Sequence, residues 1–242
     1  GAVLHGIDLT VAEGQAVALL GRNGVGKSTL FGLVTGSLRP TAGRVVFDGE
    51  DVTRRPDHAR ARAGMGKTFQ HSSLFTSLPV LDNVALATQR AAGRAMAMLR
   101  PAARHDEVQE QAMARLSQVG LAARTATPAA ALSHGERRQL EVALALATSP
   151  KLLLLDEPTA GMSATDSARF AELVESLGAA VTVLIIEHDL DVVFRLATRV
   201  TVLHLGRVLS DGTPDQVRAD ETVQRAYLGD AALGELFTEG AS

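Results

Sequence analysis

A glycine-rich stretch that ends in a lysine and a hydroxyl residue could bind phosphate. It fits the pattern G-x-x-x-x-G-K-S/T and consists of Gly21, Arg22, Asn23, Gly24, Val25, Gly26, Lys27 and Ser28. Its glycines let backbone N–H groups surround a phosphate, and a helix that starts there adds positive partial charge. Lys27 could then reach the β- and γ-phosphates of a nucleotide, and the Ser28 hydroxyl could bind Mg²⁺. The alternative is a glycine turn that matches by chance, and the strand and helix predicted on either side disfavour it.

Two adjacent carboxylates follow an apolar run much later in the chain. Asp156 and Glu157 come directly after the leucines of residues 152–155. In P-loop nucleotide triphosphatases, an Asp at such a strand end orients Mg²⁺. An acid beside it could act as general base or position the attacking water. Alone, an Asp-Glu pair more often lies in a solvated turn, but together with the glycine-rich loop it predicts hydrolysis of a nucleoside triphosphate.

Segments that alternate between strand and helix patterns must position these groups. Residues 3–20 predict two short strands joined by a turn at Glu13 and Gly14, with the second ending at Leu20. A helix over 29–36 follows the loop, and a β-hairpin is predicted over 43–53. The later patterns predict helices over 137–149, 167–178 and 191–198, buried strands over 151–158 and 180–189, and edge strands over 199–206 and 207–214 before a polar helix and tail. This alternation indicates an α/β fold with a mostly parallel sheet covered on both faces.

The composition changes between Pro79 and Leu132, where Ala, Met, Gln, Arg and Leu recur with helical periodicity. Two helices are predicted there, over 82–99 and 106–121, and Pro101 separates them. We therefore expect a core formed by residues 1–78 and 133–242, in which 1–20 and 43–53 make an antiparallel β part. Residues 79–132 are expected to form an inserted α-helical subdomain.

The overall composition restricts the class of partner. The net charge is −3 and aromatic residues make up 3% of the chain, which together disfavour nucleic acid as a partner. The chain has no cysteine, so disulfides and thiolate metal sites are excluded. The longest largely apolar run, residues 179–186, is far shorter than the ~20 residues that span a bilayer. The first residues also lack a signal-peptide pattern, so we expect any membrane connection to run through a protein partner.

From end to end the chain resembles the ATPase subunits of ABC (ATP-binding cassette) transporters, whose motifs it carries in the family's order. The resemblance implies an ABC-cassette fold and assigns ATP binding to residues 21–28 and to Thr29. It also implies a signature motif that acts on the ATP held by a partner subunit, formed by Leu132, Ser133, His134, Gly135 and Glu136. Independently of the resemblance, Ser133 and Glu136 fit a capping box in which Ser133 is the helix N-cap. Ser133 can act both as an N-cap and as a signature residue.

Two further residues gain a function only from the resemblance. Gln70 resembles the Q-loop glutamine, whose amide could meet Mg²⁺ or the lytic water. His188 resembles the switch histidine that senses the γ-phosphate and supports Glu157. By themselves, a lone Gln or His at a strand end is more often inert. The resemblance thus implies Glu157, His188 and Gln70 as catalytic residues, and Ser28, Gln70 and Asp156 as metal ligands.

The chain departs from the family's pattern at three places. The commonest signature has Gly and Gln where this chain has His134 and Glu136, and the imidazole of His134 could face ligand, helical subdomain or solvent. The family's D-loop typically ends in Asp, whereas residues 160–163 end in Ser163. The family's adenine-stacking aromatic precedes the loop, but residues 1–20 contain no Phe, Tyr or Trp. Either that aromatic lies upstream of Gly1, or Val3 and its neighbours form a weaker apolar surface.

The resemblance implies two subunits facing head to tail, each ATP lying between Ser28 of one and Ser133 of the other. Closure would be a ligand-driven population shift, because only the closed state makes both sets of phosphate contacts. The segment after Gln70 would receive a helix of a membrane permease. Leu74, Phe75 and Leu78 are candidates for that contact, unless they pack internally.

Finer features resemble the ATPases of bacterial branched-chain amino acid importers, namely residues 63–87, 160–163 and 225–230. This implies ATP and Mg²⁺ as cofactors, a periplasmic solute-binding protein as indirect partner, and a location on the cytoplasmic face of the inner membrane. Urea, amide and lipopolysaccharide transporters share much of the pattern. A soluble ABC ATPase of repair or translation, and a P-loop protein without turnover, are the remaining alternatives.

Overall fold

The computed structural model describes residues 3–68, 74–91 and 103–228. The strands are β1 (Ala16–Leu20), β2 (Val46–Phe47), β3 (Glu50–Asp51), β4 (Met65–Lys67), β5 (Leu152–Asp156), β6 (Thr182–Glu187), β7 (Arg199–His204) and β8 (Arg207–Gly212). The α-helices are α1 (Lys27–Thr35), α2 (Asp57–Ala63), α3 (Val80–Ala91), α4 (Ala103–Gln118), α5 (His134–Leu146), α6 (Ala164–Leu177), α7 (Leu190–Leu196), α8 (Pro214–Ala219) and α9 (Glu221–Leu228). Short 3₁₀ turns occupy Ala122–Arg124, Ala129–Ala131 and Gly178–Ala180.

Six strands form the main sheet in the order β4-β5-β6-β1-β7-β8. All neighbours pair in parallel except β7 and β8, which form an antiparallel hairpin. Strands β2 and β3 make a separate antiparallel hairpin, as the sequence predicts. The register sets Leu20 beside Glu187, and Asp156 beside Ile186. The carboxyl ends of β1, β5 and β6 therefore meet at one edge of the sheet, which is where ligands bind in open α/β sheets.

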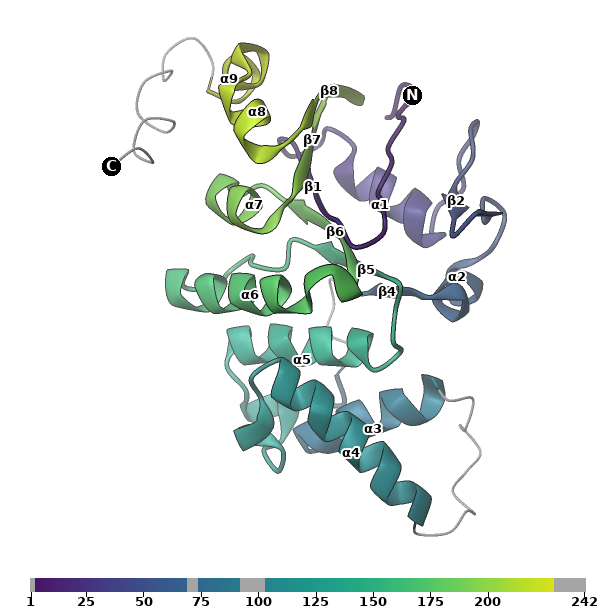
Figure 1. Cartoon of the computed structure of the whole chain (residues 1–242), viewed down its shortest axis with the longest axis vertical. Helices are drawn as coiled ribbons and strands as arrows, with labels where there is room; N and C mark the ends of the chain where they lie inside the picture. The colour runs from purple at the N-terminus through teal and green to yellow at the C-terminus, as the bar shows by residue number, and fades with distance from the viewer. Residues whose placement is uncertain (1–2, 69–73, 92–102, 229–242) are drawn as a thin grey trace.

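Helices cover both faces of this sheet (Figure 1). Side chains alternate along a strand, so Val17 and Leu19 join clusters that include residues of α1, while Ala18 and Leu20 pack with residues of α7 and α8. Strands β5 and β6 are buried along their whole length. Continuous burial explains why their sequences are apolar runs rather than alternating patterns.

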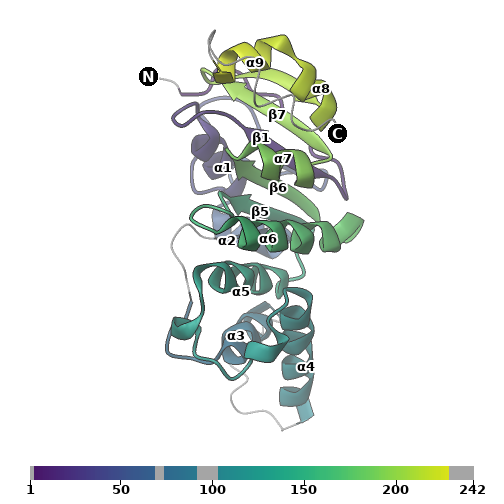
Figure 2. The same cartoon turned by 90° about the vertical axis from the view of Figure 1, so that its left-hand side faces the viewer.

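The helices α3 and α4 lie at the end of the molecule away from β8 and pack against α5 (Figure 2). Their buried residues include Val80, Val84 and Leu116, which share one cluster with Leu140 of α5 and with residues of β5 and β6. The helical part is thus joined to the sheet through α5, the helix that begins at His134.

Three features of the strands differ from the sequence prediction. The first predicted strand is absent: residues 4–12 form no strand, Gly6 takes a left-handed φ of 71°, and Leu4, Ile7 and Leu9 pack beneath the loop region. Ala16–Leu20 belongs to the parallel sheet rather than to the antiparallel part. Strand β7 is not an edge strand, because it pairs with β1 on one side and β8 on the other.

Helix α2 was not predicted, since it is short and lacks an apolar stripe, and its Arg60 attaches it to the end of α1. Arg60 is 1% exposed. Its Nη1 donates to the carbonyl oxygens of Leu33 and Val34, each at 2.6 Å. Its Nε and Nη2 donate to the oxygens of Arg55 and Thr53. The last carbonyls of a helix have no partner within the helix, so this guanidinium completes the C-terminal end of α1.

Arg60→Met is expected to lower the free energy of unfolding by about 2–4 kcal/mol, because it leaves several partly buried carbonyls without a donor. Urea unfolding measures the loss. The matched control is Arg55→Met, whose side chain makes an exposed ion pair with Glu50 at 2.8 Å. Exposed pairs contribute little, so a change within about 0.5 kcal/mol is expected. Equal losses in the two variants would contradict the capping function of Arg60.

Candidate active site

The glycine-rich loop connects the end of β1 to the start of α1, as the sequence predicts. Gly24 and Gly26 have left-handed φ values of 83° and 107°, which other residues rarely adopt. A Cβ on Gly26 would also lie 2.4 Å from Leu4 Cδ2. The backbone conformation therefore favours glycine at both positions, and Gly26 also lacks space for a side chain. Arg22, Asn23 and Ser28 are exposed, and Thr29 is half-buried.

Lys27 is buried beneath the loop, with 5% of its surface exposed. Its Nζ donates to the carbonyl oxygens of Gly21 and, at 3.1 Å, of Arg22. Burial lowers the pKa of the Lys27 ammonium below its ordinary value. Nearby carboxylates oppose that shift, and in order of effect they belong to Glu157, Asp156 and Glu187. A cation is thus held between the loop and a group of acids.

Glu157 follows β5 in an unusual backbone conformation, with a φ of 45°. Its N–H donates to Ile186 O of β6 at 2.8 Å, so the neighbouring strand holds it there. Its Oε1 lies 3.9 Å from His188 Nδ1. Non-glycine residues with positive φ cost roughly 1–3 kcal/mol and occur often at functional sites. The predicted residues Asp156, Glu157 and His188 are therefore gathered at the same sheet edge as Lys27.

Glu187 also belongs to this group, although it is not among the site residues predicted from the sequence. It is fully buried. Its Oε1 accepts from the N–H of Thr159 at 3.0 Å and from the Thr159 hydroxyl at 2.6 Å. Its Oε2 accepts from the N–H of His188 at 3.1 Å. A glutamate that ends an apolar strand and precedes His188 was the available signal, because the carboxyl ends of parallel strands meet at the sheet edge where the glycine-rich loop lies.

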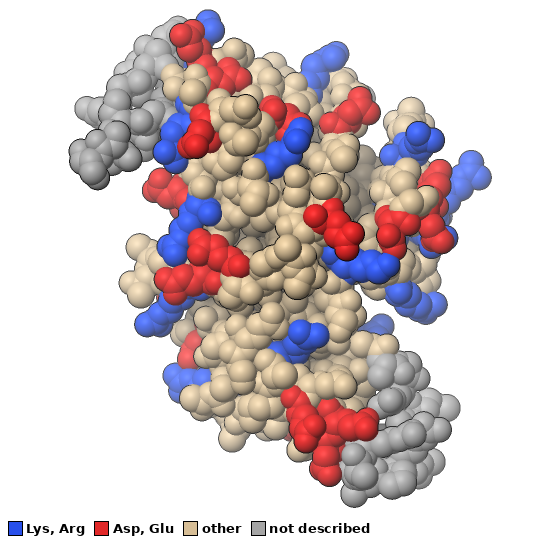
Figure 3. Space-filling view, viewed as in Figure 1, with Lys and Arg blue, Asp and Glu red and all other residues tan. Residues whose placement is uncertain are grey.

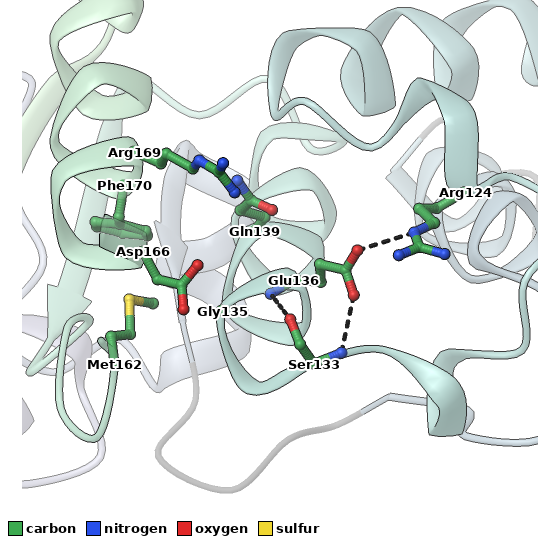
Figure 4. A pocket seen from close by; sticks show the side chains of 9 residues that line it. All are labelled: Arg124, Ser133, Gly135, Glu136, Gln139, Met162, Asp166, Arg169 and Phe170. Atoms are coloured by element: carbon green, nitrogen blue, oxygen red, sulfur yellow. Dashed lines mark hydrogen bonds and ion pairs between the residues drawn. The ribbon is translucent and has the colours of Figure 1, made fainter. Parts of the chain in front are cut away.

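The signature residues lie at the start of α5 (Figure 4). Ser133 is the N-cap, and its Oγ accepts from Glu136 N while Glu136 Oε2 accepts from Ser133 N. Arg124 Nε donates to Glu136 Oε1 at 2.9 Å. The Ser133 N–H and then Arg124 hold the pKa of the Glu136 carboxyl below its ordinary value, against its partial burial. The capping box forms as predicted, and it leaves the Ser133 side chain exposed.

A pocket of about 190 Å³ opens beside the signature (Figure 4), between the first turns of α5 and α6. Its lining includes Ser133, Gly135, Gln139, Asp166 and Arg169. Pockets for drug-sized ligands usually measure about 300–1,000 Å³, so this hollow alone is too small for a nucleotide. It suits part of a ligand that is held mainly by another surface.

His134 is exposed, but one side of its imidazole contacts another loop of the core. Its Nε2 lies 3.0 Å from Ala160 O. Ala160 belongs to the loop between β5 and α6. Next to it, a Cβ on Gly135 would lie 3.0 Å from Asp166 Cγ. Ser163 is the N-cap of α6, with its Oγ accepting from Asp166 N and donating to Asp166 Oδ2. The serine that replaces the family's Asp thus has a local capping function.

The remaining predictions have mixed outcomes. Gln70 lies outside the described residues. Leu74 is half-buried against the main core, whereas Phe75 is 58% exposed. Val3 is 49% exposed, and its Cγ1 would lie 3.4 Å from a Cβ on Gly26. An apolar side chain therefore lies near the glycine-rich loop, as one of the two alternatives for the adenine surface requires.

The surface carries acids and bases of both signs. Over the face drawn in Figure 3, Lys and Arg side chains are interspersed with Asp and Glu, and the described residues there form no broad basic area. This distribution agrees with the net charge of −3. Within residues 3–68, 74–91 and 103–228, no helix has both the length and the apolar character needed to cross a membrane.

The chain belongs to the ABC transporter family, whose sequence model matches residues 4–160. It is the ATP-binding subunit of such a transporter, an ATPase coupled to transport. A second family, described as branched-chain amino acid ATP-binding cassette transporter, matches residues 207–232.

Relatives and solved structures agree with this assignment. The chain is 37% identical over 235 residues to the high-affinity branched-chain amino acid transport ATP-binding protein BraF of Pseudomonas aeruginosa, covering 94% of this chain and 92% of BraF. It is 37% identical over 229 residues to the lipopolysaccharide export system ATP-binding protein LptB of Acidithiobacillus ferridurans, covering 94% and 91%. Its fold is similar to that of MJ1267, an ATP-binding cassette of an ABC transporter, with a TM-score of 0.81, 29% identity and coverage of 94% and 93%.

Lys27→Ala is expected to abolish measurable ATP binding, because it removes the cation that the loop and the acids hold at the phosphate position. Calorimetric titration of the full chain with ATP measures this. The control is Lys151→Ala, which removes an exposed lysine paired with Asp48 and should leave ATP affinity unchanged. An unaltered affinity in Lys27→Ala would refute the assignment of the phosphate site.

Proposed function

We propose that this chain powers the import of branched-chain amino acids. The observation that carries this proposal is similarity along nearly the whole chain to BraF, together with the match of residues 207–232 to the branched-chain cassette family. A relative from Escherichia coli, LivG, is named for the same transport and is 34% identical over 235 residues. We propose that permease subunits, a second ATPase subunit and, indirectly, a periplasmic solute-binding protein complete the system. The chain would then lie on the cytoplasmic face of the bacterial inner membrane.

The hydrolytic step follows from the acids at the sheet edge. Glu157 is proposed to accept a proton from the attacking water, so that the water oxygen bonds to the γ-phosphorus as the bond to the β–γ bridging oxygen breaks. ADP and phosphate are the products. His188, whose Nδ1 is 3.9 Å from Glu157 Oε1, would hold the carboxylate in position. Lys27 would hold the β- and γ-phosphates against movement during the step.

The residues present fit Mg²⁺, which prefers oxygen donors. The exposed hydroxyl of Ser28 and the carboxylate of Asp156, whose charge acts on Lys27, lie at the same edge of the sheet. We propose that these two residues, with Gln70, would hold the ion. When bound, it would neutralise charge that develops on the phosphate oxygens.

The two halves of the ATP site are proposed to come from two copies or two related chains. Helices α1 and α5 cover opposite faces of the sheet (Figures 1 and 2). The exposed Ser133 at the start of α5 is therefore suited to a phosphate held by a partner, and the small pocket beside it is suited to part of that nucleotide. A dimeric ATP-binding cassette, MJ0796 with bound ADP and phosphate, has a similar fold, with a TM-score of 0.73, 26% identity and coverage of 88% and 90%.

Export of lipopolysaccharide is the second candidate, because LptB is as similar in sequence as BraF. The two candidates differ in a measurable way. Removing the gene from its host should abolish uptake of radiolabelled leucine, isoleucine and valine, and the wild-type gene, but not Lys27→Ala, should restore it. Unchanged uptake together with lipopolysaccharide retained in the inner membrane would reject the import of these amino acids and favour the exporter.

Glu157→Gln is expected to lower ATP turnover by about a hundred- to ten-thousand-fold, the usual contribution of a general base. ATP binding should persist, and an ATP-bound dimer should accumulate, which light scattering detects. The matched control is Glu172→Gln, at an exposed residue paired with Arg195. This variant should hydrolyse ATP like wild type and return to the monomer after hydrolysis. Full turnover in Glu157→Gln would refute the proposed base.

A further inference from the structure

The loop from Glu157 to Ser163 joins the carboxylate end of β5 to α6 and is held from both sides. On the side of β6, the Thr159 N–H and hydroxyl donate to the fully buried Glu187. On the side of α5, His134 Nε2 lies 3.0 Å from Ala160 O. The loop is therefore fixed between the strand that carries His188 and the helix that carries the signature.

The contact of His134 has a defined direction. A carbonyl oxygen can only accept a hydrogen bond, so Nε2 of His134 must carry the proton and donate to Ala160 O. The following residue, Gly161, has a left-handed φ of 75°, and a Cβ there would lie 3.5 Å from His134 Nε2. The imidazole thus lies directly against the turn of the loop. The exposed ring adds little apolar burial there, so its main contribution is this hydrogen bond.

Two hydrogen bonds connect His134 to the backbone of Glu157. Ala160 accepts from His134 through its oxygen and donates through its N–H to Glu157 O at 3.2 Å. The conformation of Glu157 has little freedom, because its φ is 45° and its own N–H is bound to Ile186 O. The first turn of α5 therefore helps to hold the backbone that sets the direction of the Glu157 side chain, and loss of the His134 bond would remove that support.

We propose that His134 is a positioning residue that couples the two ATP sites of the proposed dimer. Within one chain, Ser133 would contact the partner's ATP, whereas Glu157 acts on the ATP of its own loop. His134 links Ser133 to Glu157. Contact between Ser133 and the partner's ATP would therefore set the direction of the Glu157 side chain toward the ATP bound by the same chain. This inference rests on the proposed head-to-tail dimer. It assigns a function to a signature position where the family commonly has glycine, which has no side chain to make this bond.

A pair of amides tests the hydrogen bond. In His134→Gln the side-chain NH₂ can occupy the position of Nε2, whereas the shorter side chain of His134→Asn cannot reach Ala160 O. His134→Asn and His134→Ala should lower kcat by about 3- to 10-fold, the factor that one neutral hydrogen bond corresponds to, with little change in KM. Their Hill coefficient for ATP should fall toward one, and His134→Gln should recover most of the wild-type kcat and cooperativity.

The measurement is the ATPase rate of the full-length chain as a function of ATP concentration at fixed protein concentration. His58→Ala is the control, because His58 is an exposed histidine of α2, and it should behave like wild type. Wild-type kcat and cooperativity in both His134→Ala and His134→Asn would overturn the proposal. Equal losses in the Gln and Asn variants would also overturn it, because they would indicate a general requirement for the ring.

A second measurement separates this inference from the proposed dimer. Glu157→Gln should dimerise with ATP, and the double variant Glu157→Gln/His134→Ala should do so equally well, because Ser133 is retained. If Glu157→Gln alone fails to dimerise, the proposed dimer is refuted. If it dimerises and the His134 variants hydrolyse ATP like wild type, the dimer stands and only the coupling is refuted.

Discussion

A buried ammonium beside three carboxylates is the interaction around which this molecule is arranged. Lys27 would be strongly disfavoured in the interior without partners, and its carboxylate partners come from two segments far from it in the chain, residues 156–157 and Glu187. Parallel pairing of β1, β5 and β6 sets the phosphate loop, Asp156 and Glu187 at one sheet edge. The apolar runs of these strands therefore matter to the proposed catalytic step, because their register fixes where the charges meet.

One strained residue lies next to that charge cluster. Glu157 holds a left-handed backbone although glycine would adopt it more easily. Its position is maintained by the Ile186 carbonyl and by the Thr159–Glu187 bonds that fix the following turn. The same loop contacts His134 on its other side. Rigid support from two directions gives a short loop the precision that the proposed general base needs.

Much of the candidate site could be predicted because each of its motifs consists of residues that lie close together in the sequence. The phosphate loop, the acids after β5 and the Ser133–Glu136 capping box each lie within eight residues or fewer in the sequence. Contacts between distant segments could not be predicted in this way. The partners of His134, Glu187 and Arg60 are set by how helices and strands pack, not by spacing. The missing first strand has a similar cause, since its apolar residues pack beneath the loop instead of pairing.

The ends of the main sheet have a consequence for how copies of the protein meet. One end is β4, a strand of three residues, and the other is β8, whose pairing with β7 contains an irregular register and which carries Arg207 and Asp211. Short, charged or bulged margins resist the addition of foreign strands. Copies at high concentration are therefore discouraged from pairing edge to edge through their sheets. Without such permanent pairing, an association that depends on a ligand can be reversed when that ligand is consumed.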